Sequence, residues 1–161
     1  MPNPQILNNA GAWTAGATYG NAYASVDQEI TPLVNNSGAV RTVGDVVITD
    51  GANNANTTTT VNDRNVIGVV APHGQANTQS STETYAAGAI MPVVTKGLAR
   101  INVGANAPAN GDVLTTSAVA GAAITNAGAP AANAVIGSLI GIVEANTKDA
   151  QNCVIANIGK F

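Results

Sequence analysis

The chain has 161 residues and a formal net charge of −3, with 6 Lys and Arg against 9 Asp and Glu. Apolar residues reach 45% while charged residues make up only 9%, so the chain is hydrophobic enough to fold and too weakly charged for ordinary disorder. The lack of a basic field argues against nucleic acid as a partner, and a single histidine and a single cysteine leave no zinc ligand set.

Residues 1–30 show neither a twofold nor a helical period in their apolar positions, which predicts an extended N-terminal arm. The arm holds three of the five aromatic residues, Trp13, Tyr19 and Tyr23. Aromatic side chains often anchor interfaces, so we expect these three to bind a partner. The arm could instead fold back as an extra strand on its own body. It lacks the apolar segment of a signal peptide, and no membrane partner is expected.

Residues 31–161 predict an all-β body, because short runs of β-branched residues alternate with Gly, Asn and Asp turns. The clearest expected strands are 30–34, 39–43, 46–49, 66–70 and 152–158. Residues 53–60 form a polar, Thr-rich insert, for which we favour a loop, with residues 57–61 continuing as a strand.

Residues 89–95 and 98–103 predict a hairpin around Lys96-Gly97, because glycine supplies the positive φ of a tight turn. Pro92 would then lie at an edge or a bulge. In the second strand Leu98, Arg100 and Asn102 alternate with an apolar face formed by Ala99, Ile101 and Val103.

An internal repeat is the most informative pattern. Gly44-Asp-Val-Val returns as Gly111-Asp-Val-Leu, and Val66-Ile-Gly-Val-Val is echoed by Ile140-Gly-Ile-Val. Each Gly-Asp pair opens a strand that leads through a polar stretch to a glycine-containing strand. The pattern predicts two related β-units, or one barrel built from two similar halves.

The titratable residues offer little chemistry. His73 is the one candidate general base. The sequence identifies neither a carboxylate that would orient it nor a nucleophile that it would activate, so an ordinary loop histidine is expected. Asp45 and Asp112 are expected to serve their turns rather than to form a catalytic pair. Cys153 is expected to be a small buried hydrophobic residue. The scattered basic residues read as solvated strand positions: Arg41, Arg64, Lys96 and Arg100.

So few charges on a strand-rich body predict a protein whose surface is covered by copies of itself or by a larger assembly. We expect no catalytic residue, cofactor or metal. The enzyme alternative, a trimeric β-fold nucleotide hydrolase, would need an acidic metal site and basic phosphate contacts. A carbohydrate-binding domain would need more aromatic residues for a stacking platform.

Over residues 38–160 the order of several segments is distinctive: Gly44-Asp-Val-Val, Val66-Ile-Gly-Val-Val, Gly88-Ala-Ile-Met-Pro-Val-Val-Thr-Lys-Gly, Asn110-Gly-Asp-Val-Leu-Thr-Thr-Ser and Ile140-Gly-Ile-Val-Glu. In this order they resemble small β-rich bacteriophage virion proteins, above all capsid decoration (cement) proteins. The resemblance implies a compact β-barrel or β-tulip-like body. It also implies a homotrimer on the outer capsid surface that bridges major capsid protein subunits, made in the host cytoplasm and without an active site. A phage fibre or tail-associated β-module is the alternative.

Overall fold

The computed structural model describes residues 28–73, 80–126 and 136–159, and in this part the chain forms strands, turns and no α-helix. These described ranges hold eleven strands: β1 (Glu29–Asn35), β2 (Arg41–Thr42), β3 (Val46–Thr49), β4 (Asn54–Asn56), β5 (Val66–Val70), β6 (Thr84–Tyr85), β7 (Ile90–Asn102), β8 (Val113–Thr116), β9 (Ala123–Thr125), β10 (Leu139–Ala145) and β11 (Cys153–Ile158). The prediction of an all-β body is confirmed. The predicted arm, with Trp13, Tyr19 and Tyr23, lies outside the described residues.

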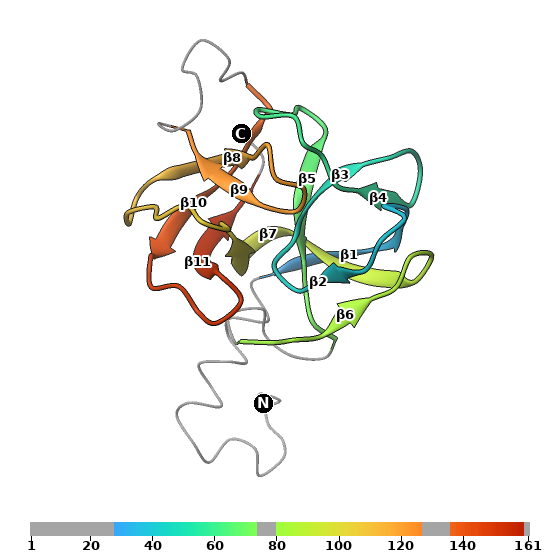
Figure 1. Cartoon of the computed structure of the whole chain (residues 1–161). Helices are drawn as coiled ribbons and strands as arrows, with labels where there is room; N and C mark the ends of the chain where they lie inside the picture. The colour runs from blue at the N-terminus through green and yellow to red at the C-terminus, as the bar shows by residue number, and fades with distance from the viewer. Residues whose placement is uncertain (1–27, 74–79, 127–135, 160–161) are drawn as a thin grey trace, which may run out of the picture.

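Nine strands form one sheet in the order β1-β4-β3-β5-β7-β11-β10-β8-β9, and β1 also pairs with β7. This second pairing closes β1, β4, β3, β5 and β7 into a five-stranded barrel, while β8 to β11 continue as an open sheet beside it (Figure 1). One core cluster is formed mainly by residues of the barrel strands and includes Leu33, Val47 and Met91. The other joins the barrel to the open sheet and includes Val69, Ile101 and Ile140.

Strand β7 is shared by both parts of the body. Its first half pairs with β1 and β5, and its second half pairs with β11 from Gly97 to Asn102. The predicted hairpin around Lys96-Gly97 is therefore wrong, since residues 90–102 form one strand. Gly97 does take a positive φ of 105°, but it redirects the strand from the barrel to the open sheet rather than reversing the chain.

Two smaller predictions on the barrel strands are also wrong. Pro92 lies in a strand with neighbours on both sides, directly opposite Pro32 of β1. The Pro92 carbonyl accepts a hydrogen bond from the Ala71 N–H, and the nitrogen of a strand residue points to the same side as its carbonyl. The Pro92 nitrogen therefore faces the side on which β5 ends at Val70, so the missing N–H costs no hydrogen bond between strands. In the Thr-rich insert the strand is β4, which pairs with β3 and β1, whereas residues 57–61 form no strand.

The two predicted β-units are present, and each contains the same pair of hydrogen bonds. In the first unit the Gly44 N–H donates to the Val70 carbonyl at 2.8 Å, and the Val70 N–H donates to the Asp45 carbonyl at 2.9 Å. In the second unit Gly111, Val143 and Asp112 make the same two bonds at 2.7 and 2.9 Å. Strand β3 pairs with β5 just as β8 pairs with β10, so the sequence repeat corresponds to a structural repeat.

Candidate interaction surface

The turn aspartates bond within their own units. The Asp45 carboxylate accepts from the Thr42 N–H at 3.1 Å, and Asp112 accepts from the Ala109 N–H at 2.8 Å, three residues earlier in each case. The predicted turn role is confirmed for both residues. Burial raises the pKa of Asp45, against the opposing effects of the Thr42 N–H, the charge of Arg41 and the Asn102 amide.

Arg100 is buried, although the sequence suggested a solvated strand position. It is 1% exposed, and its Nε and Nη2 atoms donate to Asp149 Oδ2 at 2.6 and 2.5 Å. Nη1 and Nη2 also reach the Ser81 carbonyl and Gln151 Oε1. The guanidinium therefore fastens two loops to the outer side of β7 and β11. Arg41 is also largely buried, since it pairs with Asp45 at 3.6 Å and its side chain is 14% exposed.

Cys153 is 2% exposed on the neighbouring strand β11 and confirms the prediction of a buried hydrophobe. Burial raises the pKa of its thiol to about 12, against the opposing charge of Arg100. The thiol therefore stays protonated and unreactive at neutral pH. Among the residues that the structure describes, no group of three or more His, Cys, Asp or Glu side chains could hold a metal ion.

His73 has a carboxylate partner that the sequence did not reveal. Its Nδ1 lies 2.7 Å from Glu83 Oε1, and its backbone N–H donates to Glu83 Oε2 at 3.1 Å. Tyr85 donates to the Ala71 carbonyl and also reaches Glu83. Burial and the charge of Glu83 raise the pKa of Tyr85, so its phenol remains a donor rather than a nucleophile. The arrangement ties the two sides of a surface loop together.

Glu83→Gln should loosen this connection without unfolding the body. Burial raises the Glu83 pKa, but hydrogen bonds from the His73 ring and backbone and from Tyr85 lower it further, so the carboxylate is the favoured form. The His73 side chain is 65% exposed, so we expect a stability loss under about 1 kcal/mol. Hydrogen exchange should show a faster His73 amide. An unchanged exchange rate at this amide would contradict the assignment.

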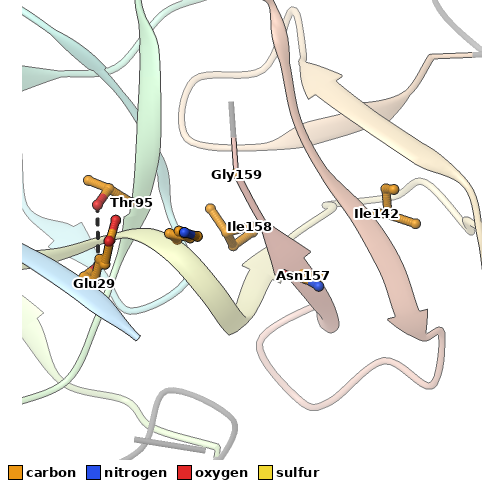
Figure 2. A pocket seen from close by; sticks show the side chains of 7 residues that line it. Glu29, Thr95, Ile142, Asn157, Ile158 and Gly159 are labelled. Atoms are coloured by element: carbon orange, nitrogen blue, oxygen red, sulfur yellow. Dashed lines mark hydrogen bonds between the residues drawn. The ribbon is translucent and has the colours of Figure 1, made fainter. Parts of the chain in front are cut away.

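Two adjoining hollows with apolar lining residues lie on the outer side of β7, β10 and β11. One hollow has a volume of about 470 Å³ and lies between the start of β1, the middle of β10 and the end of β11 (Figure 2). A second, of about 630 Å³, adjoins it and shares Lys96 and Asn157. We name this area, which no described segment covers, the open face and define it by six residues: Lys96, Leu98, Ile142, Glu144, Ile155 and Asn157.

The open face mixes aliphatic and polar side chains. Ile142 is 37% exposed, and Leu98 and Ile155 are half-buried, while Lys96 and Glu144 provide charges of opposite sign. Further exposed aliphatic side chains lie elsewhere on the body: Ile30, Val40, Ile90, Val119 and Ile136. Such a surface suits binding to protein. In the described part of the chain no helix is long and apolar enough to cross a membrane.

The comparisons with known proteins show a likeness of fold. No family model matches the chain, and no curated protein matches it. Among solved structures, a chain from "The capsid of Myoviridae Phage XM1" superposes with a TM-score of 0.53 at 19% sequence identity, over 83% of this chain and 84% of that chain. This protein therefore shares its all-β fold with a chain from a phage capsid structure.

Proposed function

We propose that the protein is a structural component of a bacteriophage virion that binds the outer surface of the assembled capsid. The observation that carries the proposal is the likeness of fold to a chain from a phage capsid structure across 83% of this chain. The resemblance of the Gly-Asp-Val segments to decoration proteins supports the same role. The protein then acts by binding to major capsid protein rather than by catalysis.

The surface of the body supports a role in an assembly. Only 9% of the residues are charged, and aliphatic side chains such as Ile90 and Val119 are more than half exposed. A trimer that bridges capsid subunits would present each weak contact three times, and repeated contacts give tight binding without a single strong site. We therefore propose a homotrimer on the capsid, with Trp13 of the arm among its partner contacts.

Binding to capsids tests the proposal directly. Purified full-length protein should sediment with assembled capsids and should label their outer surface in negative-stain micrographs. Label on tails or fibres alone would contradict a position on the capsid and favour the tail-associated alternative. A mass measurement of the free protein tests the trimer. Metal-dependent nucleotide hydrolysis by the purified protein would overturn the non-catalytic assignment.

Trp13→Ala should lower occupancy on capsids by at least ~tenfold, because truncation of an interface tryptophan typically removes a large share of the binding free energy. Gln5→Ala, a polar change in the same arm, serves as the matched control and should leave occupancy unchanged. Sedimentation at several protein concentrations measures both variants, and circular dichroism checks that the β-body is intact. Equal binding by Trp13→Ala and the unaltered protein would remove Trp13 from the interface.

A further inference from the structure

The open face is the uncovered half of a continuous sheet surface. On the same strands, Arg100 is buried beneath the loops that carry Ser81 and Asp149, and the Cys153 thiol is buried against the Val43 and Gln151 carbonyls. Leu98 lies two residues before Arg100 on β7, and Ile155 lies two residues after Cys153 on the antiparallel strand β11, where no described loop covers them. Half of this surface is therefore closed by the body itself, while the more apolar half is left open.

The chain enters the body at the border of the open face. The side-chain amide of Gln28 donates from Nε2 to the Leu98 carbonyl at 2.5 Å, and Glu29 lines the first hollow. The Gln28 Oε1 atom is buried and has no hydrogen-bond partner among the described residues. A buried oxygen without a donor is costly, so this position calls for an additional N–H group.

Residues 1–27 have a composition that suits this surface. They contain one charged side chain, Asp27, and three of the five aromatic residues of the chain. A segment with so little charge can cover the aliphatic side chains without placing unpaired charges on them. Tyrosine is especially suitable because its ring packs against aliphatic groups while its hydroxyl stays in water.

Among the aromatic residues of the arm, Tyr23 is attached nearest to the open face. Tyr23 lies five residues before Gln28, which corresponds to a reach of about 17 Å at ~3.3 Å per residue. Three neighbouring strands span only about 10 Å, so Tyr23 can reach any part of the face. Trp13 lies fifteen residues before Gln28 and can extend about 50 Å, far enough to meet a partner.

We propose that residues 19–27 of the same chain fold back onto the open face, with the Tyr23 ring against Leu98, Ile142 and Ile155. Attachment through Gln28 gives this segment an effective concentration on the order of mM, which favours it over the corresponding segment of a neighbouring copy. The inference concerns the chain alone and stands whether or not the capsid proposal does. It assigns Tyr23 to the body and leaves Trp13 for the partner.

Disulfide trapping in the full-length chain tests this placement. In Ala24→Cys/Asn157→Cys, one new thiol is next to Tyr23 and the other lies at an exposed position in the open face. We expect rapid formation of an intrachain disulfide, seen as a monomer on non-reducing gels and as two protected cysteines after alkylation. Adding Tyr23→Ala should slow the reaction at least ~tenfold, whereas adding Trp13→Ala should not change it.

Ala24→Cys/Ile90→Cys is the matched control. Ile90 is 63% exposed but lies at the opposite end of the β1–β7 pair, facing Val34, whereas Lys96 of the open face lies opposite Glu29. We expect little disulfide in this variant. Equal rates for the two pairs, or a rate that does not depend on Tyr23, would overturn the proposal. A disulfide-linked dimer in place of the monomer would also overturn it and would identify a neighbouring copy as the occupant.

Discussion

Asp149→Asn is expected to lower the free energy of unfolding by about 3 kcal/mol or more, because it leaves the Arg100 guanidinium buried without a counter-ion. Two guanidinium nitrogens of Arg100 donate to the same Asp149 oxygen, and the arginine side chain is 1% exposed. A domain of ordinary stability, about 5–15 kcal/mol, would lose a large share of it. Urea unfolding followed by circular dichroism measures the change.

The opposite truncation, Arg100→Met, should cost less. Methionine retains much of the buried volume, and the remaining carboxylate is 24% exposed. Asp149 also keeps its hydrogen bonds from the Gln151 and Cys153 N–H groups at 2.8 and 3.0 Å. Asp112→Asn, a change in a turn exposed to solvent, is the control and should cost under about 1 kcal/mol. A larger loss for Arg100→Met than for Asp149→Asn would contradict this account.

The same ion pair predicts how stability depends on acid. Burial raises the Asp149 pKa, but the N–H groups of Cys153 and Gln151 and the charge of Arg100 lower it further, so the net shift is downward. A carboxyl whose pKa is lower in the folded state stabilises the fold above its unfolded pKa of about 3.9. This contribution is lost as the pH falls through the lower folded value. Below about pH 4, the free energy of unfolding of the Asp149→Asn variant should therefore fall less steeply with decreasing pH than that of the unaltered protein.

Local turn chemistry made the repeat predictable from the sequence. Asp45 and Asp112 each close a turn with an N–H three residues earlier, and such bonds depend only on neighbouring residues. Lys96-Gly97 shows the limit of the same reasoning. A positive φ serves a tight turn and a redirected strand equally well, and the difference lies in the distant partners β1, β5 and β11.

Burial of charged and polar groups depended on contacts that are remote in sequence. Alternation correctly placed Arg100 opposite the apolar face of its strand, but its partner Asp149 is 49 residues away. His73 and Glu83 are ten residues apart without a recognisable motif between them. The open face was equally hidden, because it brings together β7, β10 and β11 at the point where the described chain begins.

Gly68→Ala is expected to destabilise the protein by about 3 kcal/mol or more, because there is no room for a methyl group. A Cβ atom at this position would lie 2.1 Å from the Val94 carbonyl oxygen and 2.9 Å from Val93 Cγ1. Both atoms belong to β7, which is shared by the barrel and the open sheet. Relief of the clash requires movement of the backbone of β5 or β7. Thermal or urea unfolding with a circular dichroism readout measures the loss.

The structural repeat provides an internal comparison for this prediction. Gly141 lies two residues before Val143, as Gly68 lies two residues before Val70, and its added Cβ would lie 2.7 Å from the Asn157 carbonyl oxygen. Gly141→Ala should therefore be destabilising by about 1–3 kcal/mol, less than Gly68→Ala. At Gly38 an added Cβ meets nothing within 4 Å, so alanine there adds only the strain of its φ of 74°, about 1–2 kcal/mol. Gly68 has no positive φ, so a loss at Gly68 no larger than that at Gly38 would contradict the close approach to β7.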